Sequence, residues 1–260
     1  MRYRVRMARI LIPLPDTDFD TTEVAVPWRV LTDAGHAVMF ATETGNVAAC
    51  DPRLLSGVVF GKLGADESAK ECYRQASRSS EFLRPLPWPG LVATDFDALL
   101  LPGGHAPGMR QYLGSESLQR LVAEFAALDR PIAAICHGVL VLARATHACS
   151  GLSVLHGRRT TCLPRYMEAF AFGLSFWKLG RYYRTYPAYV ESEVRAALAA
   201  PADFERGPIT LGDRGTADDD AAAFVVEDGN YISARWPGDA WLLSRRLVVR
   251  LKALRAKAAA

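Results

Sequence analysis

Long hydrophobic runs, paired cysteine motifs and a dominant charge are all missing from this sequence of 260 residues. No apolar stretch reaches the roughly 20 residues that a membrane-spanning helix needs, so we expect no contact with a membrane. Lys and Arg number 31 against 28 Asp and Glu, which leaves a net charge of only +3. Because this balance creates no overall basic field, we expect no nucleic-acid partner.

The cysteines form neither a disulfide framework nor a zinc motif. They stand at positions 50, 72, 136, 149 and 162, an odd number without a Cys-x-x-Cys pair. The Arg-rich start, residues 1–9, lacks the apolar run and cleavage site of a signal peptide. We therefore expect a reducing cytoplasm and, outside position 136, cysteines that take no part in chemistry.

Short apolar runs alternate with helical patterns along much of the chain. This order predicts a parallel sheet with helices on both faces, in which ligands bind at the carboxyl ends of the strands. The predicted strands cover residues 8–14, 37–42, 97–101 and 131–135, and the predicted helices run from Thr21 or Thr22 to about Ala34, from Ser115 onward and over 137–146.

Two segments interrupt the alternation, at about 45–95 and 165–205. The first contains a polar, helical stretch and the second is rich in aromatic residues, so both are predicted to be lid or interface material over one core. A hairpin around Asp228-Gly229 and a helix over 237–257 complete the pattern. Residues 1–260 are therefore expected to form a single domain with two insertions.

Cys136 lies where a predicted strand meets a predicted helix, in Ala134-Ile135-Cys136-His137-Gly138. The pattern is a loose form of the Gly-x-Ser-x-Gly elbow, which exposes a nucleophile above a sheet. The positive end of the following helix is expected to lower the pKa of the thiol and to hold an oxyanion. The alternative is an inert core cysteine, but the elbow context favours a nucleophile.

The neighbouring strand ends in a glycine pair, Gly103-Gly104, followed by His105. Glycines allow backbone N–H groups to approach a substrate oxygen closely. We therefore expect Gly103, Gly104 and His105 to line the substrate site, with the amides of Gly104 and His137 as oxyanion donors.

Four stretches together resemble the ThiJ/PfpI superfamily of class I glutamine-amidotransferase-like proteins, and more narrowly its heat-shock chaperone and glyoxalase III branch. They are DFDTTEVAVPW, LLLPGGHAPGMR, AAICHGVLVLARA and RRTTCLPRYME. The resemblance implies a flavodoxin-like sandwich in which Cys136 is the nucleophile, Glu23 faces its sulfur, and His137 and Glu168 complete a catalytic triad. We also expect a homodimer.

Each of these roles has a structural alternative. Glu23 suits the first turn of a helix, where the dipole favours an acidic side chain. Glu168 fits an exposed helical position, and His137 fits a capping or packing role. The cluster at 181–186, basic and aromatic, is compatible with nucleic-acid stacking, but near-neutral net charge favours a packed lid or a dimer contact. The segment 235–239 is expected to border the site, as a substrate contact or as a capping loop.

The predicted activity is cysteine-dependent chemistry on small reactive carbonyls, and the resemblance implies a glyoxalase that needs no glutathione and converts methylglyoxal to lactate. An amidase or peptidase with the same triad is one alternative. A redox-sensitive chaperone is another, because an accessible thiolate oxidises readily. We expect neither a metal nor an organic cofactor, because the thiol supplies the covalent chemistry.

Overall fold

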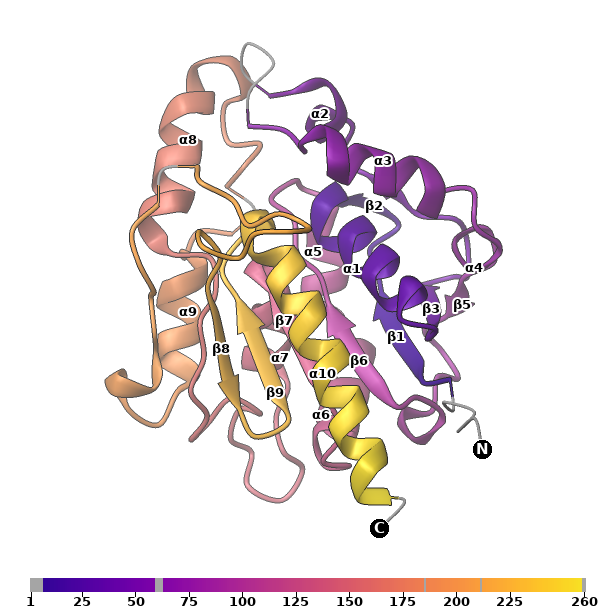
Figure 1. Ribbon diagram of the computed structural model, residues 1–260. Helices are drawn as coiled ribbons and strands as arrows, with labels where there is room; N and C mark the ends of the chain where they lie inside the picture. The colour runs from indigo at the N-terminus through magenta and orange to yellow at the C-terminus, as the bar shows by residue number, and fades with distance from the viewer. Residues whose placement is uncertain (1–6, 59–62, 185, 211, 259–260) are drawn as a thin grey trace.

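Seven strands form one central sheet in the computed structural model, which describes the chain except residues 1–6, 59–62, 185, 211 and 259–260 (Figure 1). The strand order is β5-β3-β1-β6-β7-β9-β8, parallel throughout except for β8, which runs antiparallel to β9. The strands are β1 (Arg9–Pro13), β3 (Ala37–Thr42), β5 (Leu86–Pro87), β6 (Ala98–Leu101), β7 (Ile132–Ile135), β8 (Val225–Asp228) and β9 (Tyr231–Ala234), with a separate parallel pair of β2 (Thr17–Phe19) and β4 (Ala49–Cys50).

Helices cover both faces of the sheet, as the alternating pattern predicts. In Figure 1, α1 and α10 lie side by side in front of the sheet, and α6 and α7 lie behind it. The α-helices are α1 (Thr21–Asp33), α2 (Pro52–Ser56), α3 (Glu67–Ala76), α4 (Ser80–Leu83), α5 (Met109–Leu113), α6 (Glu116–Ala126), α7 (Val139–Arg144), α8 (Arg165–Leu179), α9 (Val190–Ala197) and α10 (Ala240–Ala258), and 3-10 turns cover Ala93–Asp95, Cys136–Gly138, Pro201–Asp203 and Pro237–Asp239.

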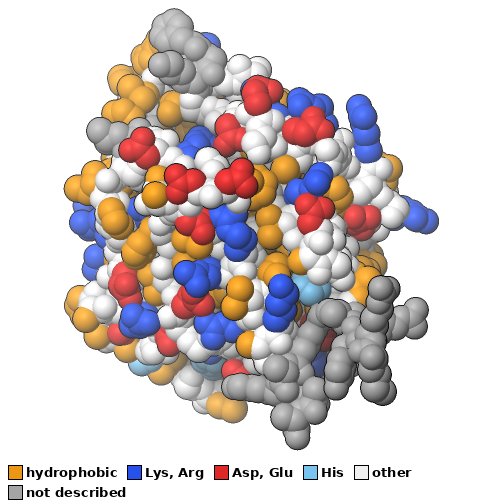
Figure 2. All heavy atoms as spheres, in the orientation of Figure 1, with side chains coloured by type: hydrophobic (Ala, Val, Ile, Leu, Met, Phe, Trp, Pro, Cys, Tyr) orange, Lys and Arg blue, Asp and Glu red, His pale blue; other side chains and the backbone are white. Residues whose placement is uncertain are grey.

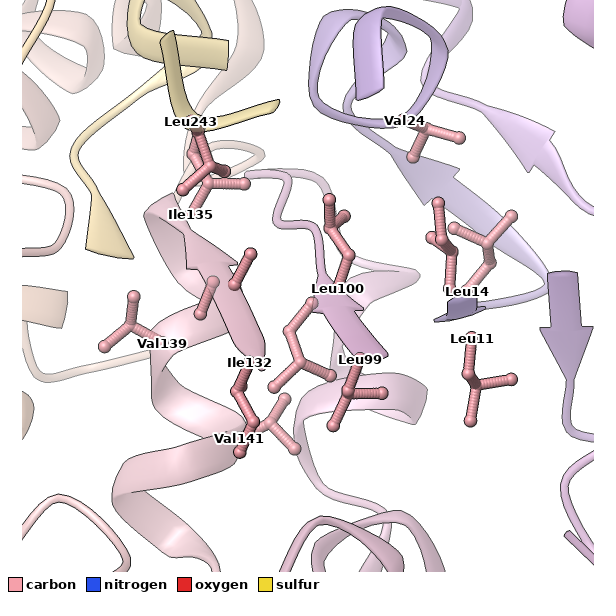
Figure 3. Close-up of a cluster of buried hydrophobic side chains, with 14 of the residues drawn as sticks. Leu11, Leu14, Val24, Leu99, Leu100, Ile132, Ile135, Val139, Val141 and Leu243 are labelled. Atoms are coloured by element: carbon pink, nitrogen blue, oxygen red, sulfur yellow. The ribbon is translucent and has the colours of Figure 1, made fainter. Parts of the chain in front are cut away.

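The central strands are buried on both faces, which explains why they read as continuous apolar runs. All side chains of β6 and β7 are buried, and those of β1 are buried after Arg9. Figure 3 shows Leu99 and Ile132 from neighbouring strands within one cluster that also takes in Val139 of α7. This packing fixes the strands against the helices, and it thereby fixes the positions of the loops at the carboxyl ends of the strands.

The predicted fold class is confirmed, and one detail of it is wrong. The hairpin of β8 and β9 and the Ser115 cap of α6 are present as expected. The cap of α1, however, is Asp20 rather than Thr21 or Thr22, because its carboxylate accepts the N–H groups of Thr22 and Glu23. Among the described residues, no helix has both the length and the apolarity needed to cross a membrane.

Gly138 sets the distance between β6 and the turn that follows β7. A Cβ atom at this position would collide with the backbone carbonyl of Leu101. Gly138→Ala is therefore expected to destabilise the fold by about 3 kcal/mol, measured by chemical denaturation. Gly173→Ala is the control, since no atom lies within 4 Å of its added methyl group in α8; comparable losses in both variants would contradict this explanation.

Candidate active site

The predicted elbow is present at the end of β7. Cys136 has a φ of +58°, a left-handed conformation that is strained for a residue with a side chain. It opens the 3-10 turn Cys136–Gly138, from which α7 continues. The thiol is nearly inaccessible, with 1% of the residue exposed. The backbone therefore holds the sulfur at a fixed point at the carboxyl end of the sheet.

His137 lies beside the sulfur, with its Nδ1 atom 3.5 Å from the Cys136 Sγ atom. The ring of His105 packs edge-on against it, with 4.6 Å between the ring centroids. Burial lowers the pKa of His137 well below its ordinary value, and the neighbouring His105 lowers it further. Burial also lowers the pKa of His105 to about 4. Both rings are therefore neutral near pH 7.

Glu23, in the first turn of α1, reaches the loop that packs against the elbow. Its Oε2 atom accepts a hydrogen bond of 2.7 Å from the Gly103 N–H group. Burial and the charge of Asp20 raise the pKa of Glu23, whereas the contact with the Cys136 thiol lowers it. A carboxyl group with a raised pKa retains a proton that it can share with the adjacent sulfur.

The predicted lowering of the Cys136 pKa is wrong for this closed site. Burial raises the pKa of the thiol well above its usual value, and the charge of Glu23 raises it further. The His137 backbone N–H group acts in the expected direction, but its effect is smaller than these two. Ionisation of the sulfur therefore requires transfer of its proton to a neighbouring group.

The two glycines after β6 pack against different parts of the structure. A Cβ atom on Gly103 would lie 2.6 Å from the backbone nitrogen of His137 and 3.1 Å from the Cys136 Cβ atom. A Cβ atom on Gly104 would instead meet the Asp18 carbonyl and the Met109 sulfur. Gly103 thus packs against the elbow, whereas an oxyanion contact from Gly104 stays a prediction.

Glu168 is buried in α8 but is bonded away from the two histidines. Its Oε1 atom pairs with Arg184 at 3.0 Å, and its Oε2 atom accepts the Val190 N–H group at 3.0 Å. Within the described part of the chain it makes no hydrogen bond with His137. The structure therefore brings Cys136, His137 and Glu23 together and places Glu168 in the packing of the second insertion.

A cavity of about 370 Å³ lies at this end of the sheet, and His105 belongs both to its wall and to the cluster around His137. Residues of both insertions contribute to its wall, and their action as lid material stays a prediction. The lining residues are Asp20, Asp51, Leu54, Val58, Leu63, His105, Leu163, Tyr166, Met167, Phe170, Ala171, Tyr183, Thr210, Gly212, Arg214, Trp236 and Pro237.

Part of the cluster at 181–186 packs inside the molecule, between the two insertions. Tyr183 and Arg184 are buried, and the Tyr183 hydroxyl donates to Asp51 at 2.9 Å across the two insertions. The His105 ring lies 5.9 Å from the Tyr183 ring. Residue 185 lies outside the described residues. Trp236 and Pro237 line the cavity, so the segment 235–239 borders the site as expected.

Asp20 is a buried carboxyl group at the site that the sequence analysis did not identify. Asp20 stands three positions before Glu23, a spacing typical of the start of a helix. This spacing is the sequence signal that identifies Asp20 as the cap of α1. Burial raises the pKa of Asp20 to about 6, against the lowering effects of the Glu23 N–H group and of Arg214. The protonated form is therefore favoured by folding, and this stabilisation is lost as the pH rises from about 4 through 6.

Asp20→Asn is consequently expected to stabilise the protein by up to about 3 kcal/mol at pH 7.5, because the amide keeps the capping oxygen without the buried charge. The gain should vanish below pH 4. Urea denaturation at both pH values measures it, with the exposed Asp33→Asn as the control. A variant that is less stable than the wild type at pH 7.5 would contradict the assignment.

The described residues also bring one set of metal-ligating atoms together. Nitrogen atoms of His105 and His137 and the Cys136 sulfur lie within 4.8 Å of one another. Nitrogen and sulfur donors suit Zn²⁺, but a bound ion would occupy the sulfur that the elbow presents. These residues are therefore compatible with either a metal ligand set or a nucleophile with its base.

Comparison with known proteins identifies the group to which this arrangement belongs. The model of the ThiJ/PfpI family-like proteins matches residues 14–208. The chain is a member of the ThiJ/PfpI family. The resemblance inferred from the sequence is thereby confirmed. The flavodoxin-like fold also agrees with the crystal structure of glyoxalase III from Candida albicans, which has a TM-score of 0.67 at 19% identity and covers 94% of this chain and 97% of that one.

Three relatives add detail to the ThiJ/PfpI assignment. An uncharacterised protein of Schizosaccharomyces pombe is 32% identical over 93% of this chain and 83% of its own length. A deglycase of Pyrococcus abyssi is 25% identical over 94% of this chain and 99% of its own. The glutathione-independent glyoxalase hsp3101 of Schizosaccharomyces pombe is 26% identical over 56% of this chain and 59% of its own. Enzymes therefore occur among the relatives.

Proposed function

We propose that this protein is a cysteine-dependent enzyme that converts small 2-oxoaldehydes, such as methylglyoxal, to 2-hydroxy acids without glutathione. The observation that carries the proposal is the junction of three groups: a strained Cys136, His137 at 3.5 Å from its sulfur, and the buried carboxyl group of Glu23. The relative named as a glutathione-independent glyoxalase supports the substrate class.

In the first step the sulfur attacks the aldehyde carbon while the Cys136 proton passes to neutral His137. Nearby N–H groups, that of His137 among them, receive the developing oxyanion. His137 then gives this proton to the oxygen, which forms a hemithioacetal and restores the neutral ring for the next step. Glu23 holds the Gly103 loop against the elbow through its hydrogen bond of 2.7 Å and shares its proton with the sulfur.

In the second step His137 takes the hydrogen from the former aldehyde carbon as a proton and returns one to the adjacent ketone carbon through an enediol. The product is a thioester of the 2-hydroxy acid, in which the first carbon has been oxidised and the second reduced. Water then hydrolyses the thioester, which releases the acid and restores the thiol. Since oxidation and reduction occur within one molecule, no external redox partner is consumed.

Redox sensing by Cys136 is one alternative and, like attack on a substrate, it requires access to a sulfur that is buried here. Hydrolysis of amides by the same residues is the second candidate, and the relative named as a deglycase is the observation that favours it.

The test is lactate formation from methylglyoxal by the purified full-length protein, without glutathione and with EDTA present. The proposal predicts turnover under these conditions. A protein that produces no lactate but suppresses aggregation of a denatured test protein would contradict it and support a chaperone. Hydrolysis of amides or glycated amines without lactate formation would support the hydrolase.

A further inference from the structure

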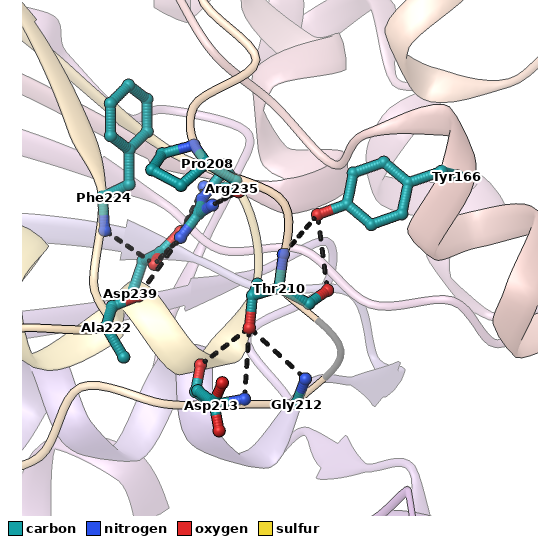
Figure 4. A network of polar contacts seen from close by, with 9 residues as sticks. All are labelled: Tyr166, Pro208, Thr210, Gly212, Asp213, Ala222, Phe224, Arg235 and Asp239. Atoms are coloured by element: carbon teal, nitrogen blue, oxygen red, sulfur yellow. Dashed lines mark hydrogen bonds and ion pairs between the residues drawn. The ribbon is translucent and has the colours of Figure 1, made fainter.

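The described residues of the segment 208–215 are held in place by hydrogen bonds at the wall of the cavity (Figure 4). Arg235, in a buried ion pair with Asp239, donates to the Pro208 carbonyl at 2.8 Å. The Tyr166 hydroxyl, from α8, accepts the Thr210 N–H group at 3.1 Å. Residue 211 lies outside the described residues. These contacts join the loop to both the sheet end and the second insertion.

Arg214 extends from this loop and lines the cavity. Its guanidinium lies over the Trp236 ring, 5.0 Å from the centroid, and its Nη2 atom donates to the Gly64 carbonyl at 3.2 Å. The Nη1 atom is buried and has no hydrogen-bond partner among the described residues. A buried N–H donor without a partner is costly, so this atom is available to an acceptor that enters the cavity.

The surroundings of Arg214 define the shape of a matching ligand. Most of the cavity wall is apolar, including Leu54, Met167 and Phe170. The Asp51 carboxylate, also in the wall, is already bonded to the Tyr183 hydroxyl and the Arg53 N–H group. The cavity therefore has a mostly apolar wall and one arginine N–H group, Nη1 of Arg214, that lacks a hydrogen-bond partner among the described residues.

Asp20 connects this donor to the reacting residues. Asp20 lines the cavity together with Arg214 and His105. The His105 ring packs against the ring of His137, the residue after Cys136. A ligand that extends from Arg214 past Asp20 to His105 therefore has its acidic end at the arginine and its other end at the histidine pair.

We infer that Arg214 anchors the carboxylate of the substrate, and that the preferred substrates are 2-oxoaldehydes with an apolar chain or ring ending in a carboxylate. The inference rests on the proposed function for the reacting end of the molecule. The carboxylate accepts a hydrogen bond from Nη1, a charge-assisted contact that is worth roughly tenfold or more in affinity.

The binding experiment uses an unreactive pair, 3-phenylpropionate and 3-phenylpropanamide, titrated calorimetrically into the full-length protein. The wild type is expected to bind the acid about tenfold more tightly than the amide, and Arg214→Gln is expected to lose this preference. Arg181→Gln, an exposed arginine in the second insertion, should retain it. Arg214→Lys provides a second variant that keeps the charge, and thermal melts verify folding.

The titrations of the wild-type protein are a test by themselves. Equal affinity for the acid and the amide, or no binding of either, would overturn the inference. A preference that persists in Arg214→Gln would overturn it as well. In a turnover assay, 4-carboxyphenylglyoxal should be converted with a higher kcat/KM than its methyl ester. If neither compound nor methylglyoxal is converted while the acid still binds selectively, the anchor stands and the proposed reaction is refuted.

Discussion

Cys136→Ser is expected to lower lactate formation from methylglyoxal by roughly 10³-fold or more. A serine hydroxyl at the same elbow keeps the geometry but is a far weaker nucleophile, and the neutral His137 ring lies beside it. The measurement is the initial rate of lactate formation at saturating methylglyoxal. The near-isosteric change leaves the strained backbone and the core packing in place.

Two cysteines serve as controls for this variant. Cys149 is exposed and Cys162 is buried, so Cys149→Ser tests surface thiols and Cys162→Ser tests the effect of removing a buried sulfur. Both should keep activity within a few-fold of the wild type once they fold. Equal activity in Cys136→Ser and Cys149→Ser would refute the assignment of the nucleophile.

His137→Ala is expected to reduce kcat by about 10²–10⁴-fold, the range for loss of a general acid–base group. Glu168→Gln should reduce it less than roughly tenfold, because Glu168 is bonded to Arg184 and Val190 rather than to His137. The exposed His156→Ala should have no effect.

The same series decides whether Glu168 belongs to the triad. If Glu168→Gln lost as much activity as His137→Ala while its melting temperature stayed unchanged, the carboxylate would have to leave Arg184 and orient His137 during turnover. A loss of thermal stability with little loss of kcat would instead fit the packing role seen here.

The fold was predictable because burial on both faces leaves a clear pattern in the sequence. The run 37–42 becomes β3 with the same bounds, and 8–14 contains β1. The elbow was predictable for a related reason, since a small-residue strand followed by Cys136-His137-Gly138 restricts the turn locally. Figure 2 shows acidic and basic side chains interspersed on one face, in keeping with the small net charge.

The remaining features depend on contacts between distant segments. Asp51 and Tyr183 are 132 positions apart, and Arg214 lies in a loop without a local pattern. Burial of the Cys136 thiol is likewise a property of the assembled site, which explains why the helix end alone gave the wrong direction for its pKa. Glu168 was assigned by resemblance, and its bond to Arg184 is invisible in the sequence.

Covalent attachment of substrate carbon to Cys136 is the central step of the proposed reaction. Rapid acid quenching of the wild type during methylglyoxal turnover, followed by peptide mass spectrometry, tests it most directly. The expected result is a mass increase of one methylglyoxal molecule on the peptide containing Cys136, present during turnover and absent after substrate is exhausted. Lactate formation at full rate with this peptide unmodified throughout would contradict it.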